Sequence, residues 1–377
     1  MTTRYFATCA RGLEPILARE LAALGADGVA PGRGGVAFDG SPALVYRANL
    51  WLRTAVRVLR PVLEAAVHST DELYDAVRTV DWSEYMTPDH TLAVDCNVRD
   101  SKITHSQYAA RRVKDAICDQ FRERVGRRPS VDTERPGVGI NLHVARDHIV
   151  LSLDSSWGSL HKRGYRPVQT RAPLNEALAA GLLLYLGYDG TEPLYDPMCG
   201  SGTFAVEGSW IALDRPPGLT RKWFGFFGWL DFDKGLWSAI RDDARRGVRT
   251  ALPTPIGGSD VRSDAVEFAR GNARSAGVGH LLRFEKLELK QARPPAGPPG
   301  LLICNPPYGE RLGEEKELEP LYRSIGEAVA ANWPGWRLAV FTANDRLARK
   351  VKHRVRRSTP FFNGSLACKL WEFEPTS

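Results

Sequence analysis

Two short stretches of the sequence carry residue types that could do chemistry on a bound cofactor and its reaction partner. The first, DPMCGSGTF (196–204), places Asp196 after an apolar run and four residues before Gly200, with Gly202 close behind. Glycines there allow positive φ and a close backbone approach, which a cofactor loop between a strand and a helix requires. An acid at that spacing suits a cationic ligand and opposes a pyrophosphate. The loop therefore favours S-adenosylmethionine, although it also fits the looser G-x-G-x-x-A dinucleotide fingerprint.

Two acids at the ends of the next predicted strands extend this candidate site. Asp260 closes PTPIGGSD, and Glu288 lies near the end of LLRFEKLEL. The carboxyl ends of parallel strands meet at one edge of a sheet, so both acids are expected beside the glycine loop. The first can accept hydrogen bonds from both ribose hydroxyls, and the second can contact an adenine edge. The spacing therefore predicts a cofactor that carries a nucleoside.

The second stretch, CNPPYGE (304–310), ends an apolar run in a rigid corner, because two prolines neither continue a strand nor enter a helix interior. The side-chain oxygen of Asn305 and the carbonyl of Pro306 are acceptors whose directions the prolines fix in advance. Two acceptors aimed at a planar exocyclic amine favour a pyramidal nitrogen with a free lone pair. Tyr308 offers a face on which a base can stack. The corner predicts methyl transfer to an amine such as guanine N2 or adenine N6.

The elements that must position these stretches alternate between strand and helix from about residue 170 onward. Apolar strand segments precede both motifs, and amphipathic helices follow, which is the pattern of a parallel, doubly wound sheet in an α/β fold. The last apolar segment, LACKLWEFEP (366–375), is expected to be an edge strand.

Before residue 170 the sequence predicts two smaller modules. A strand, helix, strand, helix, strand order is typical of a ferredoxin-like α+β module. A capped amphipathic helix, an alternating strand, a long cationic helix and a strand hairpin then form a second module.

Composition limits the classes of protein to which the chain could belong. It has 377 residues, of which 43% are hydrophobic and 25% charged, with a net charge of +7 that fits a polyanionic partner. Its six cysteines form no CxxC pair or His–Cys cluster, so we expect no metal site. We find no secretory signal and no run near the roughly 18 apolar residues of a membrane span. We therefore expect a soluble, cytoplasmic protein with no membrane partner.

Together these motifs resemble those of a known group of enzymes. DPMCGSGTF and NPPYGERLG resemble class I S-adenosylmethionine-dependent amino-methyltransferases. ITHSQYAARRVKDAICDQFRERVGRRPSVD, LSLDSSWGSLHKRGYR and APLNEALAAGLL are similar to the THUMP-containing RNA guanine-N2 methyltransferases of the RlmL type. The resemblance covers nearly the whole chain.

The resemblance implies three domains and a reaction. A ferredoxin-like module is expected over 1–65, a THUMP RNA-binding module over 66–165, and a Rossmann-like class I methyltransferase domain over 166–377. The implied activity is methyl transfer to the exocyclic N2 amine of a guanosine in structured RNA, by a monomer. 23S ribosomal RNA is favoured over transfer RNA.

The resemblance also implies roles for individual residues. Contact with S-adenosylmethionine is expected from Pro173, Leu174, Asn175, Asp196, Cys199, Gly200, Gly202, Thr203, Asp260, Glu288 and Asn305. Catalysis is expected at Asn305, Pro306, Pro307 and Tyr308. RNA contact is expected from Lys102, Arg111, Arg112, Lys114 and Arg166.

Other functions remain open from the residues alone. The corner at 305–308 would suit a protein glutamine amide as well as a base. The chain could also be a non-catalytic RNA-binding assembly factor, or a dehydrogenase that leaves the corner unexplained. The segment RLARKVKHRVRR (346–357) has seven cations and no acids, and is either a phosphate contact or a solvated helix face. The aromatic segment 221–232 is expected to pack against its own domain.

Overall fold

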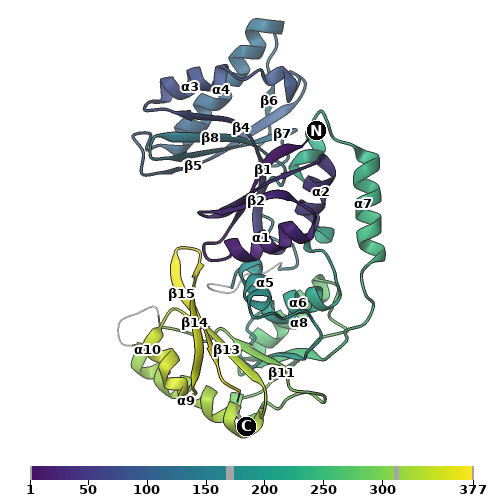
Figure 1. The fold of residues 1–377 in the computed structure, drawn as a ribbon, viewed down its shortest axis with the longest axis vertical. Helices are drawn as coiled ribbons and strands as arrows, with labels where there is room; N and C mark the ends of the chain where they lie inside the picture. The colour runs from purple at the N-terminus through teal and green to yellow at the C-terminus, as the bar shows by residue number, and fades with distance from the viewer. Residues whose placement is uncertain (1, 167–173, 310–313, 376–377) are drawn as a thin grey trace.

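The computed structural model describes residues 2–166, 174–309 and 314–375, which form two large sheets and the helices that cover them (Figure 1). Within these ranges, no helix combines the length and the apolar character that crossing a membrane would need.

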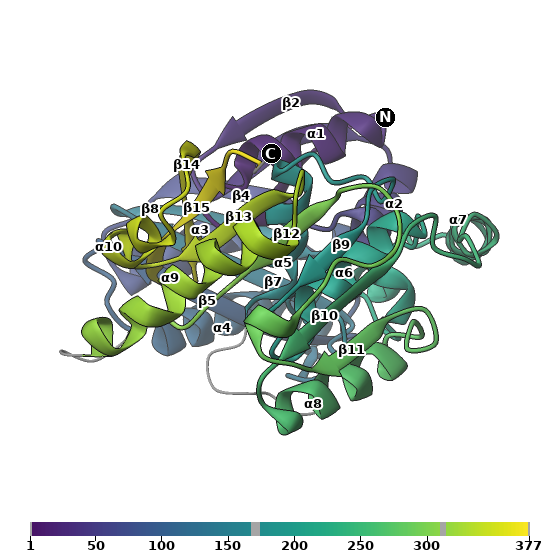
Figure 2. The same cartoon turned by 90° about the horizontal axis from the view of Figure 1, so that it is seen from below.

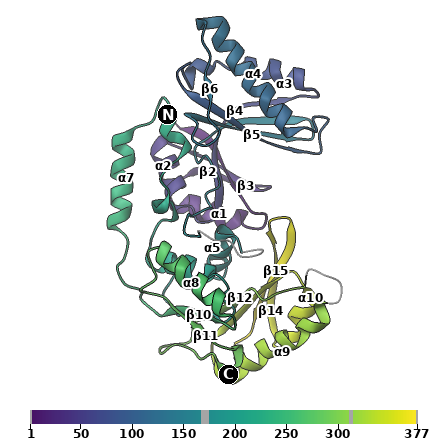
Figure 3. The same cartoon turned by 180° about the vertical axis from the view of Figure 1, so that it is seen from behind.

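The first sheet has eight strands, and helices cover one of its faces (Figures 1 and 3). Its helices are α1 (Glu14–Ala23), α2 (Pro42–Trp51), α3 (Thr70–Arg78) and α4 (Ser106–Val125). In spatial order, its strands are β2 (Asp27–Gly32), β3 (Gly35–Gly40), β1 (Thr3–Cys9), β4 (Ala55–Ala66), β8 (His148–Asp154), β7 (Val138–Ala145), β5 (Thr91–Arg99) and β6 (Ser130–Val131).

The alternation of side chains along the strands explains why only one face is covered. In β1, Tyr5 and Ala7 are buried in the core beneath the helices, whereas Phe6 and Thr8 point to the opposite face. The helices begin where the sequence predicts, since Ser69 accepts a hydrogen bond from the backbone N–H of Glu72 at 3.1 Å to cap α3.

Strand β4 joins the two N-terminal modules into one sheet. It pairs with β1 on one side and with β8 on the other, both antiparallel. Because β4 extends to Ala66, it belongs to both modules, and the sheet runs through the boundary expected from the sequence at 65. The two modules therefore form one continuous surface.

The second sheet has seven strands and carries the two motifs. In spatial order, these are β11 (Arg283–Lys286), β10 (Ile256–Asp260), β9 (Leu194–Asp196), β12 (Leu301–Cys304), β13 (Arg337–Thr342), β15 (Leu366–Phe373) and β14 (Val355–Asn363). The first five are parallel, as predicted, and β15 runs antiparallel to β13.

The expectation of an edge strand at 366–375 is wrong. Strand β15 lies between β13 and β14, and β14 forms the edge. Strand β14 begins within the cationic run and is exposed along most of its length. Its charged side chains, which are typical of an edge strand, therefore do not show the apolar pattern from which a strand is predicted. The run is therefore not a single helix: it spans α10 (Asp345–Ala348), η5 (Arg349–Val351) and the start of β14.

Helices cover both faces of the second sheet (Figure 2). On one face, Leu302 and Cys304 of β12 pack with α9 (Glu314–Asn332). On the other, Leu301 and Ile303 share a core with α5 (Glu176–Tyr185), α6 (Thr203–Ala212) and α8 (Ser263–Ser275). This alternation is what a strand buried on both faces in a doubly wound fold requires.

The aromatic segment 221–232 packs against its own domain, as expected, and also against the first sheet. Three of its rings contact Trp237, which follows the segment in the chain. Phe226 is fully buried, and its ring centroid lies 4.6 Å from that of Tyr46 in α2. A Cβ at Gly228 would clash with the carbonyl of Gly137, which shows how closely the backbones approach. The segment leads into α7 (Lys234–Arg246), which packs against α2. The segment therefore fixes the two halves of the molecule together.

Replacing Phe226 with alanine should destabilise the whole chain. Deleting a buried phenylalanine costs about 3–5 kcal/mol, and here the cavity would open between the two halves. Thermal denaturation should show a lower midpoint or a split transition. Leu230→Ala is the control, because that side chain belongs to the same segment and is 49% exposed. Equal midpoints for the two variants would contradict the joining role of Phe226.

Candidate active site

A cavity of about 810 Å³ lies at the carboxyl ends of β9, β10 and β12. Strand β9 pairs with β10 on one side and β12 on the other, so the chain connections diverge there. Ligands bind at such a switch point in open α/β sheets, because the diverging loops leave a crevice. Asp196, Asp260, Glu288 and Asn305 all line this cavity, which brings both sequence motifs together.

The glycine loop lies between β9 and α6. Gly200 has φ of 50° and Gly202 has φ of 81°, values that side-chain-bearing residues rarely adopt. A Cβ at Gly202 would also lie 3.0 Å from the Cβ of Ala269. The loop therefore needs both glycines to turn sharply from strand to helix, which explains their spacing.

Asp196 is buried at the end of β9. Its Oδ1 accepts a hydrogen bond from the backbone N–H of Met198 at 3.0 Å. Burial, reinforced by repulsion from Asp260, raises the pKa of Asp196 to about 8. A buried acid with so high a pKa is poised to accept a cationic ligand, because a positive charge beside it favours the ionised form.

The two further acids differ in their environments. Asp260 holds the glycine loop, since its Oδ2 accepts from the backbone N–H of Gly200 and its Oδ1 from that of Arg262, both at 3.0 Å. Each oxygen keeps a lone pair for another donor. Glu288 is exposed at the cavity wall, immediately before the short helix Leu289–Gln291. Both acids can therefore contact a ligand.

The other predicted cofactor residues are not all at the cavity. Leu174, Cys199, Gly200 and Thr203 line it. Asn175 instead caps α5, because its Oδ1 accepts from the backbone N–H groups of Ala177 and Leu178. Pro173 lies outside the described residues.

Arg166, predicted to contact RNA, has a buried side chain that contacts two residues that line the cavity. Its side chain is 6% exposed, and it donates to the carbonyl of Leu174 at 2.8 Å and to the hydroxyl of Thr203. Its Nε lies 3.6 Å from Oε1 of Glu176. This geometry argues against RNA contact and makes Arg166 a support for two cavity-lining residues.

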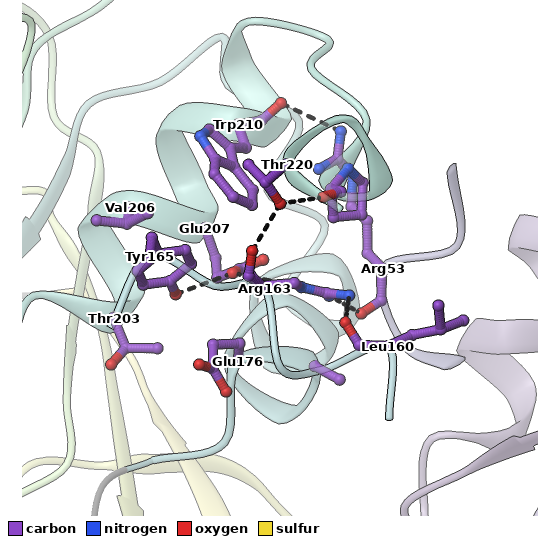
Figure 4. Close-up of polar contacts among 12 residues, drawn as sticks. Arg53, Leu160, Arg163, Tyr165, Glu176, Thr203, Val206, Glu207, Trp210 and Thr220 are labelled. Carbon is purple, nitrogen blue, oxygen red and sulfur yellow. Dashed lines mark hydrogen bonds and ion pairs between the residues drawn. The ribbon is translucent and has the colours of Figure 1, made fainter. Parts of the chain in front are cut away.

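The segment before Arg166 is fixed by buried polar contacts (Figure 4). Arg163 donates to the carbonyls of Leu160 and Arg53, and its Nε lies 3.7 Å from Glu207 of α6. Tyr165 donates to the same Glu207 at 3.0 Å. Burial raises the pKa of Glu207. These contacts tie the helix that follows the glycine loop to the first sheet.

Strand β12 ends at Cys304, and residues 305–308 leave the sheet as the two prolines predict. Oδ1 of Asn305 is buried and accepts no hydrogen bond from any described residue. The carbonyl of Pro307 accepts from the hydroxyl of Tyr322 at 3.2 Å, and the carbonyl of Tyr308 accepts from Asn344 at 3.5 Å. These two hydrogen bonds fix the backbone of the corner, and the Asn305 side-chain oxygen stays available to a ligand.

Sequence reasoning missed the residues that hold this corner. Tyr322 is fully buried and also shares a hydrogen bond of 2.8 Å with Thr342 at the end of β13. A lone tyrosine in an amphipathic helix gives no local signal of such a role. The cavity's apolar wall, which includes Val261, Phe268 and Leu287, was also missed. Val261 is 61% exposed, so an apolar ring of a ligand could cover it.

The predicted RNA-contact residues near α4 differ in their availability. Arg112 lies 2.8 Å from Asp71, and Lys114 lies 2.6 Å from Asp115. Lys102 and Arg111 are exposed and form no ion pair with any residue that the structure describes. In the run 346–357, acids partner Arg346, Lys350 and Arg357.

Three family models match the chain. The RlmL ferredoxin-like domain matches residues 4–59, and the THUMP domain matches residues 67–154. The RMKL-like methyltransferase domain matches residues 163–372, which is more than half of the chain.

Full-length comparisons agree with these matches. A ribosomal RNA large subunit methyltransferase K/L of Syntrophotalea carbinolica is 48% identical over 98% of this chain and 53% of its own length. A Synechocystis protein named as a candidate RNA methyltransferase is 43% identical over 99% of this chain and 97% of its own. The chain spans about half the length of the K/L relatives that it matches.

A solved structure agrees in fold over the entire chain. SMU.472, described as a candidate methyltransferase complexed with SAH, has a TM-score of 0.90 and 30% identity, covering 100% of this chain and 99% of that one. The predicted fold class and family resemblance are confirmed. The chain belongs to the RMKL-like methyltransferases, with RlmL-type ferredoxin-like and THUMP domains before its methyltransferase domain.

Proposed function

We propose that the chain transfers a methyl group from S-adenosylmethionine to the exocyclic N2 amine of a guanosine in RNA, most directly in 23S ribosomal RNA. The observation that carries this proposal is the Asn305 oxygen, which is buried at the cavity yet accepts no hydrogen bond from the described residues. A buried unpaired acceptor is costly unless a ligand completes it. An amine of the target base would supply the missing donor.

The residues of the cavity fit the methyl donor. Asp196 would face the cationic part of the ligand, and Asp260 could accept hydrogen bonds from ribose hydroxyls. Val261 and Phe268 would pack against the adenine ring, with Glu288 at its edge. When bound, S-adenosylmethionine supplies an electrophilic methyl group on a sulfonium. A pyrophosphate would meet the buried Asp196, which disfavours a dinucleotide.

The corner would act on the accepting amine. Oδ1 of Asn305 and the carbonyl of Pro306 would each accept one amine hydrogen, which directs the nitrogen lone pair toward the methyl group. The new N–C bond would form as the S–C bond breaks, and the amine would then release one proton to water. Tyr308 would stack on the base. Tyr322, through Pro307, keeps the corner rigid.

Ribosomal RNA is the favoured substrate because the K/L relatives are named for the large subunit RNA and match this chain over 98–99% of its length. The THUMP domain supports an RNA partner, which would place the activity in the cytoplasm. Transfer RNA remains the second substrate to test, since the same domains would grip any structured RNA.

Mapping N2-methylguanosine in RNA from a deletion strain tests the proposal. One guanosine in 23S ribosomal RNA should lose its modification and regain it when the wild-type gene is restored. Loss of the modification at a transfer RNA position would instead identify transfer RNA as the substrate. An unchanged map in both RNAs would refute guanine N2 as the target.

Arg166→Lys should weaken cofactor binding by about tenfold without altering RNA affinity. Lysine keeps the charge near Glu176 but cannot span the Leu174 carbonyl and the Thr203 hydroxyl as the planar guanidinium does. Calorimetry with S-adenosylmethionine measures the first effect. Arg246→Lys, at a side chain 72% exposed, is the control. Wild-type cofactor affinity in the Arg166 variant would show that this contact does not support the site.

A further inference from the structure

One face of the eight-stranded sheet carries no helix from the described residues, and this open face holds a large groove. Its volume is about 1000 Å³, which exceeds that of the cofactor cavity. Side chains that alternate with the core residues of β1, β4, β5, β7 and β8 form its floor. The turn between β2 and β3 and the tip of the β14–β15 hairpin form parts of its wall.

The charge of this groove is mainly positive. Six arginines and three acidic residues line it. Three of the six arginines have acidic partners, because Arg4 pairs with Asp39, Arg57 with Asp95 and Asp154, and Arg99 with Asp100. Arg11, Arg33 and Arg146 are exposed and form no ion pair with any described residue. These three cations are available to an anionic partner, and they come from three separated connections around the groove.

Aromatic and amide side chains accompany the charges. Phe6 of β1 and Phe362 of the hairpin line the groove, and Arg11 lies over the Phe362 ring at 4.8 Å from its centroid. Asn97 of β5 and His143 of β7 lie side by side on the floor. Phenylalanine rings stack on unpaired bases, arginines contact phosphates, and side-chain amides form hydrogen bonds with base edges.

The groove leads toward the edge of the second sheet that carries the corner at 305–308. Thr342, at the carboxyl end of β13, pairs with Lys369 of β15, so the hairpin tip at Gly364 extends beyond that end. Strand β12 runs parallel to β13 and ends at the corner. Figures 1 and 3 show the hairpin pointing to the open face, with α3 and α4 on the far side.

We infer that this groove holds a single-stranded segment of the RNA substrate, next to the nucleotide that enters the active site. The inference rests on the proposed function for the substrate class. An acidic peptide would contact the arginines, but it would not stack on the phenylalanine rings or hydrogen-bond to the Asn97 amide. The bases of an RNA duplex are paired and stacked on each other, so they could not stack on the aromatic side chains of the groove. Arg111 is an exposed cation of α4, on the helix-covered side.

Neutralising the three free arginines tests the groove. The variant Arg11→Gln, Arg33→Gln, Arg146→Gln should bind a fluorescent oligouridine of about twelve nucleotides at least about tenfold more weakly than wild type. The slope of log affinity against log salt should shrink by about 2, since each phosphate contact on a single strand contributes about 0.7. The matched control, Arg241→Gln, Arg245→Gln, Arg246→Gln on α7, changes the net charge equally and should keep wild-type affinity.

A crosslinking measurement keeps the test informative if the triple variant folds poorly. Wild-type protein irradiated with 4-thiouridine RNA should yield crosslinked peptides from β1, β5, β7 and the hairpin. Crosslinks confined to α3 and α4, or a larger loss of affinity in Arg111→Gln than in the groove triple, would overturn the inference. Binding is measured without S-adenosylmethionine, so the binding result can be interpreted even if the proposed methyl transfer does not occur.

Discussion

Asn305→Ala is expected to lower kcat by about a hundredfold or more while changing the affinity for S-adenosylmethionine by no more than about threefold. The side-chain oxygen would act on the amine of the target base, and removing one preorganised acceptor or donor of this kind typically costs a factor of about 100–1000. An interaction made in the transition state appears in kcat rather than in cofactor binding. Single-turnover kinetics on RNA and calorimetry with the cofactor separate the two effects.

A conservative variant distinguishes this role from a structural one. Asn305→Asp keeps an acceptor oxygen at the same place and should retain more activity than Asn305→Ala. The corner should stay folded in both, because Tyr322 and Asn344 hold the carbonyls of Pro307 and Tyr308. Near wild-type turnover in the alanine variant would exclude Asn305 from the reaction.

Asp196→Asn should weaken S-adenosylmethionine binding by about 10–100-fold at pH 8.5, the range that a charge-assisted contact supplies. The pKa of Asp196 is about 8 in the free protein, so the carboxyl is mainly protonated at pH 6. Binding a cation needs the carboxylate and must then release a proton. Wild-type affinity should therefore rise by up to about tenfold per pH unit between pH 6 and 8, and level off above.

The stability of the free protein should change in the opposite direction. Because folding raises the pKa of Asp196, the folded state favours the protonated carboxyl, and stability from this group falls as pH rises from about 4 to 8. Asp196→Asn should thus raise the melting temperature at pH 8.5. Asp75→Asn, at an exposed position of α3 that forms no ion pair with any described residue, is the control for both measurements. A flat affinity profile with pH in the wild type would contradict the assignment of Asp196.

The structural features that the sequence could predict depend on local pattern. Gly200 and Gly202 are needed for the turn from β9 into α6, and Pro306 and Pro307 end β12, so spacing alone located both motifs. Alternation of strand and helix gave the parallel order of the second sheet. These features depend on residues that are adjacent in the chain, so they can be predicted from the sequence.

The parts that sequence could not predict depend on contacts between distant segments. Phe226 packs on Tyr46, which lies far away in the chain, so its partner had no local signal. Arg166 follows a cationic segment and resembles a surface residue, yet its guanidinium meets Thr203 and Glu176 in the interior. The open groove likewise exists only because β4 joins two modules into one sheet.

The most direct test of the central claim is nucleoside mass spectrometry after incubation of the purified protein with RNA from a deletion strain and methyl-deuterated S-adenosylmethionine. The proposed chemistry predicts deuterated N2-methylguanosine in 23S ribosomal RNA with the wild-type protein and a rate at least about a hundredfold lower with Asn305→Ala. Deuterium in a different nucleoside, in protein glutamine, or in neither RNA nor protein would contradict it.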